Sequence, residues 1–414
     1  MGFSYRDGRL FAEELDCEAL AQEFGTPCYV YSRAAMEAAL AEYHDALEGC
    51  EHLVCYAVKA NSNIAVLDTL AQKGAGFDIV SLGELERVLA AGGDPSKVVF
   101  SGVVKRPEEM RRALDIGIRC FNVESEAELD VLQSVAAESG KRAPVSVRVN
   151  PDVDARTHPY ISTGLRENKF GVATDVAMEM LRRAQTLSHI DVVGLDCHIG
   201  SQLVDMAPLL DALQQLLSMV DTLEAEGIHI HHLDLGGGIG VRYRDEEPPA
   251  VADYIAAVRQ ALGDRNLCLV FEPGRSIVAN AGVLLTQVHY TKDTDAHSFA
   301  LVDAAMNDFI RPALYQAWVD IQTVAPCDAQ TRAWNIVGPV CETGDFLGKD
   351  RELALAAGSV LAIQGAGAYG FVMSSNYNTR PRAAEVMIDG DTSCLVRERE
   401  SIDDLLRGER RLPK

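Results

Sequence analysis

The stretch HLVCYAVKAN (residues 52–61) joins an apolar run to a lysine and then to turn-forming residues. Residues 53–58 are apolar without interruption, and their valines, cysteine and tyrosine are typical of a buried strand. Lys59 ends that run, where an ammonium group is costly unless it is paired, neutralised or used chemically. A lysine that simply reaches water from a strand end is the alternative interpretation.

Seven further runs of the same kind follow, separated by stretches with helical periodicity. The eight predicted strands are residues 52–59, 76–81, 97–102, 119–124, 143–150, 190–200, 228–238 and 267–274. The predicted helices include ELERVLAAG (84–92), PEEMRRALDIG (107–117) and APLLDALQQLLSMVDTLEAEG (207–227). Eight alternating βα units over about 220 residues predict a closed (β/α)8 TIM-like barrel rather than an open sheet.

Capping signals mark the ends of these helices. SEAE (125–128) has the spacing of a capping box, and Gly92, Gly117 and Gly140 stand where helices are expected to end. The signals fall between predicted strands, as the βα repeat requires.

A barrel predicts that chemistry occurs at the C-terminal ends of its strands. Polar residues or glycines stand at or near most of the predicted ends. They are Lys59, Asp78, Ser101, Asn150, His198, Gly236–Gly238, Glu272 and Arg275. So many at equivalent positions favour one site built from several strands.

The chain changes character after about residue 280, where β-like runs separated by turn signals replace the helical alternation. The predicted strands are residues 283–290, 299–304, 334–339, 359–365 and 383–390. PCYVYS (27–32) also has the pattern of a strand, entering the barrel. We therefore expect a barrel domain at 31–280 and a mostly β domain made of 1–30 plus 281–414.

Composition excludes several classes of function. The 414 residues carry 38 basic and 61 acidic side chains, and a net charge of −23 argues against nucleic acid and anionic membranes. There is no apolar stretch of about 20 residues and no hydrophobic signal core, which predicts a cytoplasmic protein. The ten cysteines include no C-x-x-C pair, which favours reduced thiols over disulfides or a zinc site.

GGGIG (236–240) follows a predicted strand and offers bare backbone N–H groups, as phosphate-binding loops do. Val241 breaks the G-x-G-x-x-G spacing, and VRYRDEEPP follows where a dinucleotide fold needs a helix. A bound phosphate is favoured, and a Rossmann dinucleotide site is not.

EPGR (272–275) places a carboxylate and a guanidinium after the last strand, where they could simply pair at the surface. Beside a lysine and a phosphate loop, they indicate pyridoxal phosphate, with the carboxylate at the pyridine nitrogen. His229, His231 and His232 raise the alternative of a metal, but no acidic or cysteine partner is spaced with them. No metal is expected.

Eight motifs together carry a resemblance to a known family. They are YAVKAN, GFDIVSLGEL, NKFG, HIGSQ, LGGGIG, EPGR, VCETGD and GAYG. In order and spacing over nearly the whole chain they resemble the bacterial diaminopimelate decarboxylases, pyridoxal phosphate enzymes with an alanine-racemase-like fold. SGVVK departs from the family, which usually has glycine where Val104 stands.

The resemblance implies a role for each matching residue. Lys59 resembles the lysine that forms an imine with the cofactor, and Cys341 the proton donor. The implied cofactor contacts are Lys59, Asp78, His198, Ser201, Gly237, Gly238, Glu272, Pro273, Gly274, Arg275 and Tyr369. The implied substrate contacts are Arg275, Arg311, Tyr315, Glu342 and Tyr369. Cys341 and Glu342 resemble residues that act across the interface of a homodimer.

The leading function is decarboxylation of meso-diaminopimelate to L-lysine, the last step of bacterial lysine synthesis. Glu272 supports it, because a carboxylate favours the protonated pyridine that decarboxylation needs, whereas racemases of similar fold use arginine there. The alternative substrates are carboxynorspermidine, ornithine and arginine. Decarboxylases of ornithine and arginine usually have Asp after the cysteine, where this sequence has Glu342. A non-catalytic single-barrel carrier of the cofactor is a further alternative, disfavoured by chain length.

Overall fold

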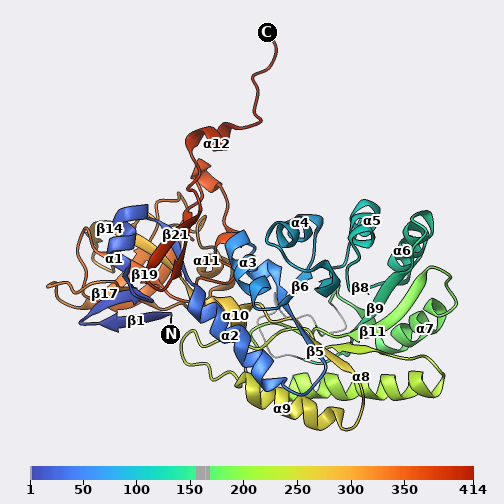
Figure 1. The fold of residues 1–414 in the computed structure, drawn as a ribbon. Helices are drawn as coiled ribbons and strands as arrows, with labels where there is room; N and C mark the ends of the chain where they lie inside the picture. The colour runs from blue at the N-terminus through green and yellow to red at the C-terminus, as the bar shows by residue number, and fades with distance from the viewer. Residues whose placement is uncertain (1, 155–163, 165–167) are drawn as a thin grey trace. The chain divides into compact units, whose positions relative to one another are not determined.

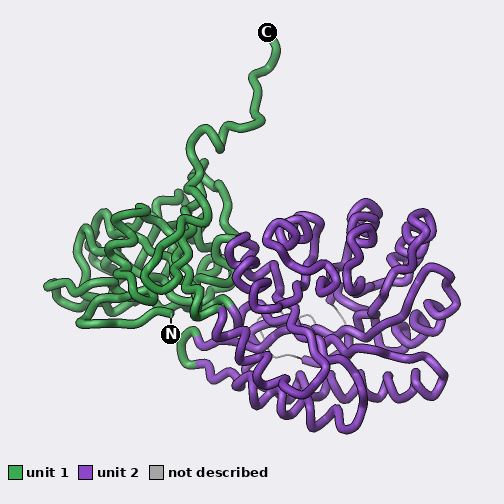
Figure 2. The backbone as a smooth tube through the Cα atoms, in the orientation of Figure 1, with its two compact units in different colours: residues 1–36, 243–245, 278–414 green, residues 37–242, 246–277 purple. Residues whose placement is uncertain are grey.

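The computed structural model describes residues 2–154, 164 and 168–414. It divides into two compact units, coloured separately in Figure 2. One comprises residues 37–242 and 246–277 and is called the barrel unit below. The other comprises residues 1–36, 243–245 and 278–414 and is called the sheet unit.

Eight parallel strands close the barrel unit, as the sequence predicts. They are β5 (His52–Ala57), β6 (Gly76–Ile79), β7 (Val98–Phe100), β8 (Cys120–Val123), β9 (Ala143–Asn150), β11 (Ile190–Asp196), β12 (His232–Asp234) and β13 (Cys268–Phe271). They pair in this order, and β13 returns to pair with β5. Each predicted strand is confirmed as an element, and the order around the barrel is the order in the chain.

Helices cover the outside of these strands, as Figure 1 shows. They are α2 (Arg33–Ala46), α3 (Ile64–Gln72), α4 (Leu82–Ala90), α5 (Pro107–Ile116), α6 (Glu126–Glu138), α7 (Thr174–Ala184), α8 (Ala207–Ala225) and α9 (Val251–Leu262). A short helix, α10 (Arg275–Val278), follows the last strand. Buried residues such as Leu53, Cys55, Val99 and Val270 pack together in one apolar cluster within this unit.

The predicted caps are formed with one difference. Gly117 ends α5 in the left-handed conformation, with φ of 74°. Ser125 begins α6 and accepts from the N–H of Glu128. Glu128 does not return the bond to Ser125, because its carboxylate instead accepts from the N–H of Glu124 and pairs with buried Lys105.

Seven of the eight barrel strands end earlier than the sequence predicts, and β9 ends at Asn150 as predicted. Lys59 lies in a 3-10 turn (Val58–Ala60) after β5, and His198 lies two residues beyond β11. Gly236 lies likewise beyond β12. Polar residues at these ends belong to turns, where Lys59 pairs with Asp78 and the N–H of Gly237 donates to His198.

A mixed sheet forms most of the sheet unit. Its connected strands run in the order β18 (Phe346–Leu353), β17 (Arg332–Val337), β15 (Ser298–Val302), β14 (Gly282–Asp293), β4 (Cys28–Ser32), β20 (Ala384–Asp389) and β21 (Thr392–Arg397). β19 (Val360–Ile363) pairs with β14 and with β16 (Ile321–Thr323). The five strands predicted after residue 280 are confirmed.

PCYVYS forms β4, which pairs with β14 and β20 in this sheet rather than with a barrel strand. The N-terminal residues add a small antiparallel sheet, β1 (Phe3–Arg6), β2 (Arg9–Ala12) and β3 (Leu15–Asp16), followed by α1 (Cys17–Phe24). The unit also holds two short helices, α11 (Arg311–Tyr315) and α12 (Ile402–Leu406).

All ten cysteines are free thiols, and six of them are buried. Among the described residues, no helix is long and apolar enough to cross a membrane.

Candidate functional site

Lys59 lies at the C-terminal end of the barrel strands, paired with a buried carboxylate. Its ammonium group forms an ion pair with Asp78, which is fully buried in β6. The parallel register places Asp78 opposite Ala57, so the turn after β5 carries Lys59 over its partner. The Lys59 side chain remains 37% exposed. The lysine is therefore paired and still accessible to a reactant.

Three further carboxylates cluster inside the same end of the barrel. Asp196 and Asp234 occupy the same register position on β11 and β12, and Glu272 follows β13 directly. One oxygen from each lies within 4.8 Å of the other two, and all three residues are buried. One oxygen of Asp196 and one of Asp234 have no hydrogen-bond donor.

Burial and mutual repulsion keep protons on this cluster. Burial first, and then the charge of Asp234, raise the pKa of Asp196 and that of Glu272 well above their ordinary values. The pKa of Asp234 is raised to about 6, again mainly by burial. Because like charges this close cannot all be ionised, the cluster holds protons at neutral pH.

Ser101 and Arg148 bound this cluster. The hydroxyl of Ser101 donates to Glu272 over 3.5 Å and accepts from Asn122 over 3.2 Å. Arg148, 7% exposed, lies 3.8 Å from Asp196. The predicted residues Ser101 and Glu272 are thus brought together in one buried network.

Arg148 also reaches the loop that follows β9. It donates to Glu124 over 3.2 Å, and Glu124 accepts from the N–H of Gly171 over 2.8 Å. Gly171 has a φ of +66°, and a Cβ there would lie 3.0 Å from the carbonyl of Arg148. The glycine of the NKFG motif is therefore required by a close backbone approach.

The glycine loop after β12 has no room for side chains. A Cβ on Gly236 would lie 2.6 Å from Nδ1 of His198, and one on Gly237 would lie 2.3 Å from the carbonyl of Glu272. The N–H of Gly237 donates to Nδ1 of His198 over 3.1 Å. Gly237 and Gly238 remain partly exposed. The loop thus packs its backbone against His198 and Glu272 together.

His198 is held as a neutral ring. Burial first, then the positive charges of Arg148 and Lys59, lower its pKa well below the ordinary value. Because Gly237 donates to Nδ1, that nitrogen is the acceptor in the neutral ring. A neutral imidazole can cover a flat aromatic ligand without adding charge.

The EPGR motif packs on the turn that carries Lys59. The N–H of Ala57 donates to the carbonyl of Pro273 over 3.0 Å, and a Cβ on Gly274 would lie 3.0 Å from Ala60. Arg275, 8% exposed, directs Nη2 to the hydroxyl of Ser201 over 3.3 Å. A cation and a hydroxyl side by side suit a phosphate ligand.

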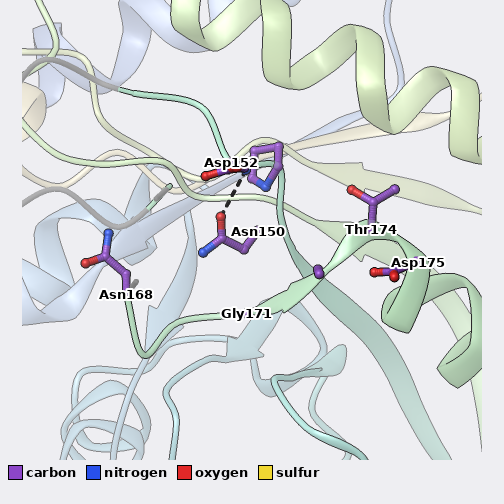
Figure 3. Close-up of a pocket in the computed structure, with 8 residues that line it drawn as sticks. Asn150, Asp152, Asn168, Gly171, Thr174 and Asp175 are labelled. Carbon is purple, nitrogen blue, oxygen red and sulfur yellow. Dashed lines mark hydrogen bonds between the residues drawn. The ribbon is translucent and has the colours of Figure 1, made fainter. Parts of the chain in front are cut away.

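A separate cavity of about 540 Å³ lies at the end of β9 (Figure 3). Its lining includes Asn150, Asp152, Asn168, Gly171 and Thr174. Asn150 Oδ1 accepts from the N–H of Asp152 over 3.1 Å. The structure therefore places Asn150, predicted from its strand end, in the lining of this cavity.

The sheet unit carries the remaining predicted site residues. Arg311, 6% exposed, begins α11, and Tyr315 ends it, partly exposed. Tyr369 lies in the loop after β19 with a φ of +55°, which is unusual for a bulky residue and marks a constrained loop.

Cys341 and Glu342 stand on an exposed loop. Buried Asp345 anchors it by accepting from the N–H of Val340 and of Met306, each over 2.7 Å. Glu342 accepts a short hydrogen bond from the hydroxyl of Tyr377. The hydrogen bond to Glu342 raises the pKa of that hydroxyl. Hydrogen bonds therefore anchor the loop, while Cys341 and Glu342 remain exposed.

The histidines that raised the alternative of a metal lie in different surroundings. His232 is buried against Cys120, and burial lowers its pKa to about 3. His229 is exposed and pairs with Glu224 over 2.9 Å.

Sequence reasoning did not select Asp196, Asp234, Arg148 or Tyr377. A signal existed for the first two, because both strands end in Leu-Asp, in GLDCHIG and LDLGGG, at aligned positions. Arg148 lies within a strand, and Tyr377 is distant in sequence from Glu342, so neither had a local signal.

Comparisons with known proteins agree with this arrangement. Residues 33–279 match the model of the pyridoxal-dependent decarboxylases, pyridoxal binding domain. The diaminopimelate decarboxylase of Pseudomonas aeruginosa is 66% identical over 412 residues, covering 100% of this chain and 99% of that protein. The diaminopimelate decarboxylase of Vibrio cholerae is 59% identical over 414 residues, with the same coverage.

Solved structures give the same result. The crystal structure of diaminopimelate decarboxylase from Helicobacter pylori complexed with L-lysine has a TM-score of 0.92 and 43% identity. The match covers 94% of this chain and 98% of that one. Because family model, full-length relatives and fold agree, this chain belongs to the diaminopimelate decarboxylases, within the pyridoxal-dependent decarboxylase family.

Proposed function

We propose that this chain decarboxylates meso-2,6-diaminopimelate to L-lysine and carbon dioxide, with pyridoxal 5'-phosphate as its cofactor. The observation that carries the proposal is the match of the whole chain to diaminopimelate decarboxylases. Lys59, the glycine loop and Glu272 support it, because they lie on one end of one barrel. The reaction is the last step of bacterial lysine biosynthesis.

The residues at this end of the barrel fit pyridoxal phosphate. Lys59 offers an accessible amine for the aldehyde. The N–H of Gly238, with Ser201 and Arg275, offers donors that a phosphate needs, and Gly237, whose own N–H donates to His198, belongs to the same loop. Any larger residue at Gly237 would push into the backbone of Glu272, so the loop and the ring-nitrogen partner fit as a unit.

When bound, the cofactor supplies an electron sink for the electron pair released with carbon dioxide. Glu272, in a cluster that retains protons, holds a proton at the ring nitrogen. His198 covers the ring as a neutral imidazole. Asp78, ion-paired with Lys59 in this structure, holds the lysine in place at the strand end.

The sheet unit supplies the substrate contacts in this proposal. Arg311 and Tyr315 bind the distal carboxylate by a bidentate contact and a hydroxyl, and Arg275 and Tyr369 contribute to binding near the cofactor. Buried Arg311 supports this role, because a desolvated guanidinium favours a charged partner strongly.

We further propose a homodimer with shared active sites in the cytoplasm. Cys341 donates a proton and Glu342 binds the substrate amine in the partner's site. The exposed but anchored loop supports this, since its functional side chains face away from their own unit's core. The free thiols support a reducing compartment. The barrel domain is then 31–280, and residues 1–30 plus 281–414 complete the dimer and the site.

The test is substrate choice by the purified protein. We expect carbon dioxide and L-lysine from meso-diaminopimelate, and little release from carboxynorspermidine, L-ornithine or L-arginine. Lys59→Ala protein is the matched control and should release none. Decarboxylation of carboxynorspermidine in preference to diaminopimelate would favour the sister activity.

A further inference from the structure

The guanidinium of Arg311 lies over two aromatic rings. Its guanidinium carbon is 4.5 Å from the ring centre of Tyr243 and 5.9 Å from that of Phe309. Phe309 is fully buried, and Arg311 is only 6% exposed. Tyr243 comes from the segment after the glycine loop and belongs to the same compact unit as α11, which is labelled in Figure 1.

A guanidinium can contact an aromatic ring and a carboxylate at the same time, through different parts of the group. Aromatic rings attract a guanidinium through its face. The N–H groups lie in the plane of the guanidinium and point outward from its edge, which is where a carboxylate binds bidentately. A ring with the cation over it can therefore restrain Arg311 without accepting the N–H bonds that a carboxylate needs.

Tyr243 is itself held in place from two directions. A Cβ on Gly365 would lie 2.9 Å from Cε1 of Tyr243, so the glycine makes room for the ring. Gly365 also has a φ of +63°, which disfavours any other residue. The next residue, Arg244, lies 5.5 Å from the ring centre of Trp318 and so holds the segment on the sheet unit.

We propose that Tyr243 is a positioning residue that sets the plane of Arg311 for the distal carboxylate of the substrate, and thereby contributes to substrate specificity. The proposal rests on the proposed function, because it takes Arg311 as the group that binds that carboxylate. Tyr243 acts through Arg311 and does not touch the reacting atoms.

The size of the expected loss of affinity follows from the cation–π contact between Tyr243 and Arg311. A partly desolvated cation–π contact contributes roughly a tenfold to thirtyfold effect on an equilibrium. Without the ring, the guanidinium of Arg311 can take other orientations. The affinity for a ligand with a distal carboxylate should therefore fall by about that factor. A ligand without that carboxylate should be unaffected.

Cadaverine provides this control. L-Lysine, the product, keeps the distal carboxylate and lacks only the one released at the reacting carbon, whereas cadaverine carries neither. We would measure kcat and KM for meso-diaminopimelate, and the affinity for cadaverine from the visible spectrum of the holoenzyme. Tyr243→Leu should raise KM for diaminopimelate about tenfold or more, with kcat and cadaverine affinity within about twofold of wild type. Tyr243→Phe, which keeps the aromatic ring, should retain wild-type values.

Tyr243→Met fills similar space without an aromatic face and serves if the leucine variant does not fold. An unchanged KM in a folded non-aromatic variant would overturn the inference. Equal losses for diaminopimelate and cadaverine would also overturn it, because they would indicate general damage. Arg311→Leu tests the proposed role of Arg311 separately from that of Tyr243. If this variant keeps the wild-type preference for diaminopimelate over carboxynorspermidine, Arg311 does not bind the distal carboxylate.

Discussion

Asp234→Asn should stabilise the protein at neutral pH, although it alters a buried polar residue. Asp234 is fully buried, and burial raises its pKa to about 6. Its second oxygen has no donor, while the first accepts from the N–H of Gly236 over 2.9 Å. Asparagine keeps that acceptor, adds an N–H donor towards the neighbouring carboxylates, and cannot ionise.

The sign follows from proton linkage. The unfolded chain releases the Asp234 proton near pH 3.8, whereas the folded state retains it to about pH 6. Stability is therefore lost as the pH rises through this window, and the loss is complete above it. The pKa rise corresponds to about 3 kcal/mol. The variant should gain up to about 3 kcal/mol near pH 7.5 and roughly a third of that near pH 4.5.

Urea unfolding of the cofactor-free protein, followed by circular dichroism at both pH values, measures this difference. Asp221→Asn is the matched control, because Asp221 is exposed and pairs with Arg265 over 2.7 Å, so its loss should change stability by less than about 1 kcal/mol. If Asp234→Asn destabilises the protein equally at both pH values, Asp234 is held as a carboxylate and the reasoning is wrong.

Gly237→Ala should weaken binding of pyridoxal phosphate by about a hundredfold. Its Cβ would lie 2.3 Å from the carbonyl of Glu272, and the loop would have to move by a substantial part of 1 Å. Titration of the apoprotein with pyridoxal phosphate measures the affinity. Gly83→Ala is the control, because a Cβ there meets nothing closer than 3.8 Å, and equal affinities of the two variants would contradict the prediction. Mixing inactive Lys59→Ala and Cys341→Ala proteins should restore up to about a quarter of wild-type activity if chains exchange at random. No recovery after demonstrated exchange would show that each chain builds its own site.

The barrel was predictable because its signals are local. Strands buried on both faces have short, continuously apolar sequences, and an amphipathic helix with its own caps follows each of them. The same rule failed for β18, whose sequence FLGKDREL is largely charged and partly exposed. It also failed for β21, which lies at the edge of its sheet beside β20 and has exposed positions. Edge strands need no apolar alternation, so only pairing in space identifies them.

The sequence by itself determined the chemical groups: a lysine after a strand, a glycine loop, and a carboxylate in EPGR. Each group can be recognised within its own segment, because it differs from the residues that the folding of that strand or loop requires. Only the tertiary structure decided that Asp234 shares its surroundings with Glu272, and that Tyr243 lies under Arg311. These partners are distant in sequence, and their pKa and orientation depend on burial and on distance in space. No local pattern carries that information.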